Sequence, residues 1–541
     1  MDGFMGWPLE LSQRYNQQGI WEGLTISEMV ERSARQRPDQ VAVTQAGQTL
    51  TYAQLIDRSK RLAVGLHRAG LQAQDRVVMQ LPNSIEFVVT YLALNWIGAI
   101  PVMALRAHRH AEVRHFIRAS GAVAYIVPGV VGHFDFRSMA QEVAPEFAHL
   151  THVWVAGEPL SGQSALMAHL AQDLSANEVD QVLQGLKPDP GQVATMLLSG
   201  GTTSMSKLIP RTHNDYVLNA KLCGAATAFN PDTRFMAILP LAHNYNLASP
   251  GILATFYYGG TVVLSEGTSS EEIFQLIQDW RVTVVAAVVP LIINWLNSDL
   301  YQQYDLSSLR VVQNGGARLP TELRMRLRER LHCIPQEIYG TAEGLINMTR
   351  LDDSEDMLLN SSGAPVSDLD EIRVVDDDGH DVPDGVPGEL VTRGPYTIRG
   401  YYLAPEKNAE AFMEGGWYRM GDIVRREGRY VFTEGRRKDL INRGGEKISC
   451  DEVENLILTH PKVKSVALVA MSDPVFGEKA CACVVTKTGQ SLSFEELVTH
   501  LKTLQIASFK LPERLVVMDA FPVSPVGKIL KRELRDQVAT L

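Results

Sequence analysis

The stretch SGGTTSMSK at residues 199–207 combines two glycines and several hydroxyl side chains with a lysine. Backbone N–H groups and hydroxyls followed by an ammonium are the groups that can surround the oxygens of a polyphosphate. The candidate phosphate contacts are Ser199, Gly200, Gly201, Thr202, Thr203 and Lys207. Gly, Ser and Thr are equally typical of an ordinary flexible turn. A Walker A loop is excluded, because it has Gly before its Lys and Ser or Thr after it, where Ser206 and Leu208 stand here.

The loop must be held at the edge of a sheet to do this chemistry. VATMLLSG at residues 193–200 has the pattern of a buried strand, and open α/β sheets bind ligands at strand ends. From Val41 onward, strand-like runs alternate with helix-like runs, one opened by the capping box Thr51–Gln54 and another beginning at Ser84. This rhythm predicts parallel sheets covered by helices. The strand-like runs are residues 41–44, 76–81, 235–240, 261–267, 282–290 and 309–316.

The pattern changes near Asp368, where short strand-like runs separated by Asp, Gly and Pro predict an antiparallel β module. The charged, glycine-rich stretch 435–449 is typical of a hinge, and about a hundred residues of mixed pattern follow it. The predicted fold class is therefore α/β. We expect a large N-terminal domain (1–435) of parallel, helix-covered sheets plus the β module, and a small mobile α+β C-terminal domain (436–541).

Composition limits the classes of function. The chain has 541 residues and a net charge of -11, which disfavours a broad nucleic-acid-binding surface. No basic stretch followed by an apolar core opens the chain, and the apolar run 84–99 contains Glu86 and Asn95, so it predicts a buried helix rather than a membrane span. We expect a cytoplasmic protein with no nucleic-acid or membrane partner.

Five cysteines are scattered without the spacing of a zinc site or a disulfide framework, which fits a reducing compartment. Cys481 and Cys483 lie in KACACVVT, whose alternation predicts a strand with both sulfurs on one face. A metal site at this pair is the lesser alternative.

Six further motifs, in order with SGGTTSMSK, resemble the adenylate-forming ligases, also called the acyl-CoA synthetase, peptide-synthetase adenylation and luciferase superfamily. PRTHNDY, LAHNYNLASPG and YGTAEGLINMTRLDD are most similar to the free-standing aryl-acid adenylating enzymes of siderophore biosynthesis. The six motifs are NGGARLP (314–320), YGTAEG (339–344), YRMGD (418–422), GRRKD (435–439), NRGGEKIS (442–449) and SPVGKILKREL (524–534).

This resemblance implies that an aryl carboxylate attacks the α-phosphorus of ATP, releasing pyrophosphate, and that a thiol then takes the aryl group. A benzoate is already ionised at neutral pH, so the first step needs no general base. Its difficulty is the repulsion between two anions, and Lys528 matches the family lysine that reduces it. Glu343 matches the acid that helps to hold Mg²⁺ against the phosphates. An isolated SPVGK is otherwise an ordinary surface turn.

The resemblance also implies the nucleotide contacts. Asp422 matches the acceptor for both ribose hydroxyls, with Arg436 assisting, and Tyr339 offers a flat face for adenine. A core aromatic residue at a strand end is the alternative reading of Tyr339. The remaining matched positions, around adenine and the aryl pocket, are Gly315, Gly316, Ile338, Gly340, Thr341, Ala342 and Ile346.

Substrate choice is implied at residues 243–249. Relatives that activate amino acids carry Asp where Asn244 stands, and a neutral amide cannot compensate a buried ammonium but can bond an ortho hydroxyl. Ser249 matches a position where dihydroxybenzoate enzymes carry Ser and salicylate enzymes tend to carry Cys. We therefore expect 2,3-dihydroxybenzoate as the aryl acid, with salicylate as the alternative. His243 and Tyr245 are expected to shape the pocket wall, and His243 to gate the thiol channel.

Lys438 matches the position at which the family's small domain pivots, and Gly444 and Gly445 match the wall of a pantetheine tunnel. Thirteen residues follow Lys528, so we expect a phosphopantetheinylated aryl carrier protein to act in trans.

The phosphate loop departs from the family pattern, because Ser204, Met205 and Ser206 replace its Gly, small and Pro residues. This departure puts the affinity for ATP, or the rate, in question. An aryl-CoA ligase and, more distantly, a non-catalytic nucleotide-binding protein are the competing hypotheses.

Overall fold

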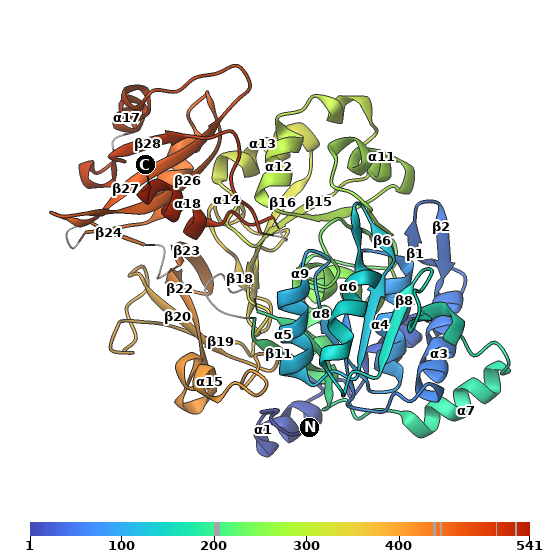
Figure 1. Ribbon diagram of the computed structural model, residues 1–541. Coiled ribbons are helices and arrows are strands. Elements are labelled where there is room, and N and C mark those ends of the chain that lie inside the picture. Colours follow the sequence, from blue (N-terminus) through green and yellow to red (C-terminus); the bar gives the residue numbers. More distant parts are fainter. Residues whose placement is uncertain (200–205, 437–439, 444–445, 505, 525–526, 541) are drawn as a thin grey trace.

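The computed structural model describes residues 1–199, 206–436, 440–443, 446–504, 506–524 and 527–540. Two large helix-covered sheets form its N-terminal part, and two smaller sheets lie to one side of them (Figure 1). The α/β class with a small C-terminal domain is confirmed.

The larger sheet has nine strands, and its six central strands are parallel, as the sequence predicts. Its edge strands are antiparallel, which the sequence pattern did not reveal. The turns that lead to β2 and β17 are too short for the crossover that a parallel pair requires. In spatial order the strands are β18 (Ala364–Pro365), β17 (Ile346–Met348), β16 (Ile334–Gly340), β15 (Val311–Gly315), β14 (Val284–Ala287), β12 (Arg234–Ala237), β13 (Thr261–Leu264), β1 (Val41–Gln45) and β2 (Gln48–Thr51).

The second sheet has seven strands and is parallel except at one edge, where β11 pairs antiparallel with β10. The loop between these two strands is the glycine-rich stretch. In spatial order the strands are β11 (Leu208–Thr212), β10 (Val193–Leu198), β4 (Ile100–Met103), β3 (Arg76–Met79), β5 (Ala124–Pro128), β8 (His152–Ala156) and β9 (Ser164–Ala165).

Helices cover both faces of each sheet, because each buried strand sends alternate side chains to opposite faces. In β3, Val77 and Met79 join the core between the two sheets, while Val78 joins the core on the outer face. The helices between the sheets are α2 (Ile26–Gln36), α3 (Tyr52–Arg68), α4 (Ile85–Trp96), α8 (His213–Ala226) and α10 (Gly251–Tyr257). The outer helices are α5 (His110–Ser120), α6 (Phe136–Val143), α11 (Ser270–Trp280), α12 (Val289–Leu296) and α13 (Thr321–Leu331).

Local sequence signals account for the helix starts in this core. Thr51 and Gln54 form the expected capping box of α3, and the Ser84 side chain caps α4. The expected buried helix at 84–99 is α4, which is buried along almost its whole length. Among the described helices, none has the length and apolarity that crossing a bilayer requires.

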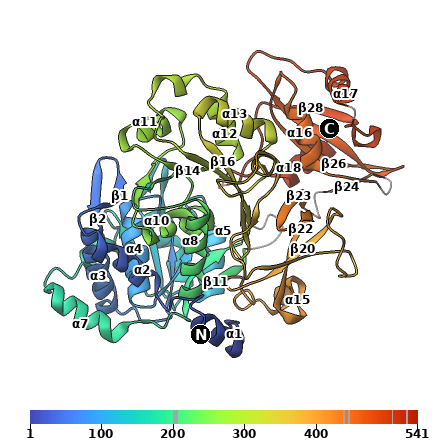
Figure 2. The ribbon, with the colours of Figure 1, turned by 180° about the vertical axis from the view of Figure 1, so that it is seen from behind.

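The β module beyond Asp368 is antiparallel, as expected. Its strands are β19 (Glu371–Val375), β20 (Gly388–Arg393), β21 (Phe412–Met413), β22 (Trp417–Glu427) and β23 (Tyr430–Arg436), with α15 (Pro405–Ala411) beside them. An N-terminal segment containing α1 (Leu9–Gln17) lies next to α15 in both views (Figures 1 and 2). Trp7 and Trp21 fasten it by donating their indole N–H groups to the carbonyls of Gly394 (3.2 Å) and Pro395 (3.0 Å).

The C-terminal sheet has its own hydrophobic core, made of residues from Ile441 to Val538. We propose that this core marks the small domain, with its boundary at residues 435–436. The strands are β24 (Ile441–Arg443), β25 (Glu446–Ile448), β26 (Val463–Asp473), β27 (Gly477–Thr486) and β28 (Arg514–Val517). Two helices, α16 (Cys450–Leu458) and α17 (Phe494–Thr503), cover one face, and α18 (Lys531–Ala539) covers the other.

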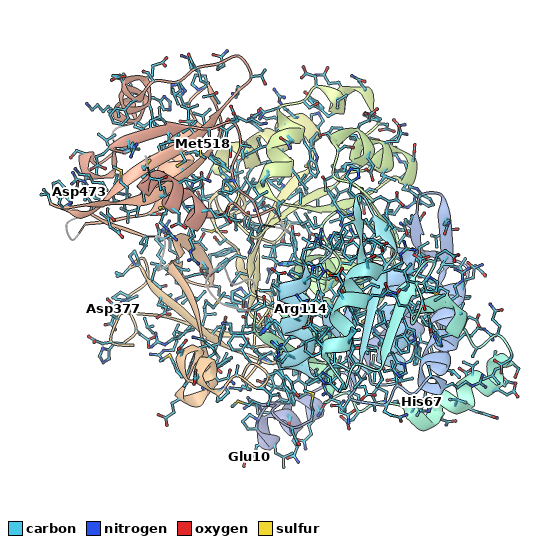
Figure 3. All side chains as sticks on the ribbon, viewed as in Figure 1. Glu10, His67, Arg114, Asp377, Asp473 and Met518 are labelled. Carbon is cyan, nitrogen blue, oxygen red and sulfur yellow. The ribbon has the colours of Figure 1, made fainter. Side chains whose placement is uncertain are left out.

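Cys481 and Cys483 lie on β27 with both side chains packed against Leu534 and Val538 of α18. The predicted strand with both sulfurs on one face is therefore correct. Within the described ranges, no third ligating side chain joins the pair. Charged side chains such as Asp377 and Asp473 stand at the outer edges of the two small sheets (Figure 3).

Candidate active site

The base of the phosphate loop is closed by two hydrogen bonds across the β10–β11 hairpin. The backbone N–H of Lys207 donates to Ser199 Oγ (2.9 Å), and the Ser199 N–H donates to the Lys207 carbonyl (3.0 Å). A strand rather than a helix follows the loop, which separates it from a P-loop. Four predicted phosphate contacts lie outside the described residues: Gly200, Gly201, Thr202 and Thr203.

The Lys207 ammonium lies over the ring of Tyr401, 4.1 Å from its centroid. Burial lowers the pKa of Lys207, and the charge of Glu343 opposes part of that shift. The Tyr401 hydroxyl donates to Glu343 Oε1 at 2.9 Å. One tyrosine therefore contacts both the candidate phosphate lysine and the candidate metal carboxylate.

Glu343 is 7% exposed and is fixed through its backbone as well as its side chain. Its carbonyl accepts the N–H of Ile398 (2.8 Å), and a Cβ on the following Gly344 would lie 2.5 Å from Thr397 Cα. Only glycine permits this close approach to segment 394–401. The hydrogen bond from Tyr401 leaves Oε2 of Glu343 as an oxygen ligand, a donor type that Mg²⁺ prefers.

The candidate adenine and ribose residues also meet. Tyr339, at the end of β16, donates its hydroxyl to Asp422 Oδ2 at 2.9 Å. The backbone of Arg436 in β23 pairs with that of Asp422 in β22. Gly340 is required where it stands, because a Cβ there would lie 2.3 Å from the Leu345 carbonyl oxygen. Thr341 follows it, and its backbone N–H donates to the same carbonyl (3.2 Å).

Lys528, from the C-terminal part, reaches the glycine pair at the end of β15. A Cβ on Gly316 would lie 2.9 Å from Lys528 Cε, and Gly316 has a φ of +91°, which favours glycine. A Cβ on Gly315 would meet the Tyr245 ring at 2.9 Å. Gly315 is also the Cα partner of Ile338 in β16. The structure thus brings Lys528 onto the residues assigned to the junction of nucleotide and aryl acid.

His243 caps the short helix α9 (Asn244–Ala248) by accepting the N–H of Tyr245 at Nδ1 (3.2 Å). Burial, together with the positive charge of Lys528, lowers the pKa of His243 to about 3. The imidazole is therefore neutral at physiological pH and does not add a second cation beside Lys528.

Asn244 and Ser249 are buried and hydrogen-bonded to each other, with Asn244 Nδ2 donating to Ser249 Oγ (3.1 Å). Two residues that the sequence reasoning missed complete the group. Tyr216 donates its hydroxyl to Asn244 Oδ1 (2.8 Å), and Asn219 donates Nδ2 to Ser249 Oγ (3.0 Å). Both come from one face of α8, and Tyr216 ends the motif PRTHNDY, which was the available signal.

A buried ion pair, Arg211–Asp215, was also missed, although it lies in the same motif. Both side chains are inaccessible, and Arg211 Nε lies 2.7 Å from Asp215 Oδ1. Arg211 also donates to the carbonyls of Ala342 (2.8 Å) and Tyr396 (3.2 Å). Arg211 therefore holds Ala342, a predicted aryl contact. Ile346, another, lies in β17 opposite Gly340.

A cavity of about 780 Å³ lies elsewhere, between α1, β20 and α15. Its lining includes Arg14, Arg393 and Arg399 but none of the predicted site residues. We propose that the chemistry takes place at the motif residues, because their contacts converge, rather than in this cavity.

Three residues predicted to form the domain pivot and the pantetheine tunnel lie outside the described residues: Lys438, Gly444 and Gly445. Their roles remain predictions from the sequence.

The model of the AMP-binding enzyme family matches residues 30–402, and that of the AMP-binding enzyme C-terminal domain matches residues 452–528. A 2,3-dihydroxybenzoate-AMP ligase of Bacillus subtilis is 42% identical over 541 residues, covering 100% of this chain and 98% of the relative. A salicyl-AMP ligase / salicyl-S-ArCP synthetase of Mycobacterium tuberculosis is 39% identical, covering 99% and 95%. The apo structure of MbtA from Mycobacterium smegmatis superposes with a TM-score of 0.75 at 38% identity, covering 99% of each chain.

Proposed function

The chain belongs to the AMP-binding enzyme family, and from this premise we propose that it is a ligase that activates 2,3-dihydroxybenzoate with ATP for siderophore biosynthesis. The observation that carries the proposal is the position of Lys528, which lies against Gly316 and beside a neutral His243. A cation from one part of the chain thereby reaches the glycine pair of the other part.

In the first half-reaction, a carboxylate oxygen of the aryl acid attacks the α-phosphorus of ATP, and pyrophosphate leaves. Lys528 reduces the repulsion between the two anions and stabilises the charge that develops on the α-phosphate. Lys207 and the loop before it hold the outgoing phosphates. Asp422 accepts the ribose hydroxyls, and Tyr339 lies beside the adenine.

Adenylate-forming enzymes use ATP together with Mg²⁺, which supplies positive charge against the phosphate oxygens. In this chain Glu343 would hold the ion, since Tyr401 and Ile398 fix its position and leave Oε2 as a ligand. Lys207, at the same tyrosine, would contact the phosphates that the ion neutralises.

The aryl acid is assigned from the group around α9. Asn244 is neutral, so it leaves an amino-acid ammonium without a counter-charge and disfavours that class of substrate. Asn244 and Ser249 hydrogen-bond the 2- and 3-hydroxyls instead. A 2,3-dihydroxybenzoate-AMP ligase from Vibrio cholerae, specific to vibriobactin, is 41% identical, which supports the same substrate.

In the second half-reaction, the phosphopantetheine thiol of an aryl carrier protein takes the aryl group, and AMP leaves. The small domain turns about Lys438, withdraws Lys528 and brings Gly444 and Gly445 beside the thiol. The name of the M. tuberculosis relative, a salicyl-S-ArCP synthetase, supports a carrier as the acceptor.

An ATP–pyrophosphate exchange assay with a panel of acids tests the first half-reaction. We expect the fastest exchange with 2,3-dihydroxybenzoate, slower exchange with salicylate and little with benzoate or amino acids. Each lost hydroxyl leaves a buried polar group unpaired, at a cost of about 1–3 kcal/mol. Equal exchange with benzoate would remove the substrate assignment. Transfer to free CoA as fast as to aryl carrier proteins would replace the proposal with an aryl-CoA ligase.

A further inference from the structure

The substrate-binding pair Asn244 and Ser249 belongs to a chain of four hydrogen-bonded side chains. Tyr216 and Asn219 lie three residues apart on α8, so they share one face of that helix. Tyr216 contacts Asn244, and Asn219 contacts Ser249. All four residues are at most 6% exposed, so each hydrogen bond fixes the direction of its neighbour.

The direction of the Asn219 amide is set by a group that can only accept. Its Nδ2 donates to the Ala248 carbonyl (2.7 Å) as well as to Ser249 Oγ (3.0 Å). A reversed amide would set its oxygen against that carbonyl. Asn219 is therefore a donor to Ser249.

The Tyr216 phenol is held as a donor by its surroundings. Complete burial raises the pKa of Tyr216 well above its usual value, so it keeps its proton. Its hydroxyl donates to Asn244 Oδ1 at 2.8 Å, which turns the Asn244 amide nitrogen toward Ser249.

Asn244 and Ser249 are then left with donors, rather than acceptors, for hydrogen bonds to a ligand. Ser249 Oγ accepts from both Asn244 and Asn219, so both of its acceptor sites are occupied and only its O–H is left to donate. The thiol of Cys223 interacts with that hydroxyl, and burial raises the pKa of Cys223 to about 12. A neutral thiol is a weak acceptor. Asn244 keeps one amide N–H that can donate to a ligand.

We infer that Tyr216 and Asn219 are positioning residues that commit Asn244 and Ser249 to donate, so that the site takes aryl acids with oxygen acceptors at ring positions 2 and 3. The inference rests on the proposed function. A phenol oxygen accepts both donors, and the 2-hydroxyl can give its own proton to the adjacent carboxylate. A ring amine fails, because its lone pair is delocalised into the ring and its N–H groups face protein donors. The site therefore rejects 2-aminobenzoate.

The test compares kcat/KM in ATP–pyrophosphate exchange for matched pairs of acids. The wild-type chain is expected to prefer salicylate over 2-aminobenzoate by at least about fivefold, the lower end of the cost of an unpaired buried polar group. Tyr216→Phe removes the donor to Asn244, lets its amide reverse, and should reduce this preference by about fivefold. Asn219→Leu frees an acceptor site on Ser249 and should similarly reduce the preference for 2,3-dihydroxybenzoate over 3-amino-2-hydroxybenzoate.

The matched control is Tyr258→Phe. It also removes a tyrosine hydroxyl that donates to α8, at the Lys221 carbonyl (2.9 Å), and this bond involves neither Asn244 nor Ser249. Its preferences should equal those of the wild-type chain. Tryptophan fluorescence checks that each variant is folded.

Two results would overturn the inference while leaving the proposed function intact. One is wild-type exchange with 2-aminobenzoate as fast as with salicylate. The other is an equal loss for every acid in both α8 variants, which is what a purely structural role produces. Absence of exchange with every aryl acid overturns the proposed function and the inference together.

Discussion

In the proposed mechanism, Lys528 takes part in adenylation but not in transfer to the thiol. Its stem rests on Gly316, and its charge helps to keep His243 neutral. Adenylation brings two anions together, whereas transfer to a thiol does not, so one lysine should matter unequally to the two steps.

Lys528→Ala should slow adenylate formation by at least about a hundredfold, in the range found when one stabilising donor is removed from a reacting anion. Transfer from preformed aryl-adenylate should be spared. Pyrophosphate exchange measures the first step, and single-turnover transfer measures the second. Lys502→Ala, an exposed change on α17 of the same domain, should alter neither. An equal loss of both steps in a folded Lys528 variant would show that the assigned role is wrong.

His213 is a buried histidine that should make the stability of the fold depend on pH. It opens α8, and its buried Nδ1 accepts the N–H of Ile26 (3.2 Å). Burial lowers its pKa to about 3. Between that value and the ordinary histidine value near 6.5, the unfolded chain binds a proton that the folded chain does not. Stability is therefore unaffected above about pH 6.5 and falls as the pH decreases below it.

This one residue should remove about 2 kcal/mol of folding free energy between pH 7.5 and pH 5. His213→Asn keeps an acceptor for Ile26 and removes the titrating group, so its unfolding free energy should fall less on acidification. Urea titrations at the two pH values measure the difference. His133→Asn, at an exposed position, serves as the control and should keep the wild-type acid sensitivity. An identical pH dependence in the His213 variant would contradict the assignment.

At the scale of elements, the hairpin β10–β11 and helix α8 carry much of the site. Arg211 donates to the carbonyls of Ala342 and Tyr396. Thr212 is the N-cap of α8, and the Asp215 carboxylate completes the capping box by accepting the Thr212 backbone N–H. The ion pair therefore joins the strand after the phosphate loop to the segment that holds Glu343.

Asp215→Asn should destabilise the fold by about 3–5 kcal/mol, because it leaves the Arg211 guanidinium buried without a counter-charge. All seven tryptophans lie at or before residue 417, so their fluorescence during urea unfolding reports on the part that contains this pair. Arg35→Gln breaks a pair with the same spacing, Glu31–Arg35, in which the arginine is 75% exposed, and should cost less than about 1 kcal/mol. Similar losses in the two variants would mean that burial of the Arg211 pair contributes nothing.

The elements themselves could largely be predicted from the sequence, because strands buried on both faces are continuous apolar runs. β11 was harder to predict, because LIPRT contains a proline and an arginine, which are unusual in a buried strand. The sequence alone does not show that the arginine has a buried carboxylate partner. Tyr216 and Asn219 could not be predicted as site residues for a similar reason. Their partners Asn244 and Ser249 lie 28 and 30 residues away, and only the packing of α8 against α9 joins them.

At the scale of the whole molecule, two parts with separate cores meet at the candidate active site. Gly527 and Lys528 pack on Val288 and Gly316, and Ser449 donates its hydroxyl to the Glu434 carbonyl (2.7 Å) near the proposed boundary. Adenylation, as proposed, needs Lys528 beside Gly316. Thiol transfer, as proposed, needs it withdrawn.

Lys438→Pro should therefore impair aryl transfer to a pantetheinylated carrier far more than pyrophosphate exchange, by at least about tenfold in relative rate. A proline fixes φ and hinders a pivot while leaving the contacts for adenylation in place. Lys438→Ala removes the same side chain without restricting φ and should preserve the wild-type ratio of the two rates. Equal impairment of transfer in both variants would assign the effect to the side chain instead of the pivot.

Trp7 and Trp21 hydrogen-bond to a part of the chain that is synthesised much later than they are. Their acceptors lie 387 and 374 residues further along, at Gly394 and Pro395. At a synthesis rate of about 5–20 residues per second, the ribosome needs about 20–75 seconds to reach those acceptors after the indoles emerge. Through that interval the two indoles lack the carbonyls that fasten them in the finished fold. These two tryptophans are thus hydrogen-bonded to their acceptors only after a further 387 and 374 residues have been translated.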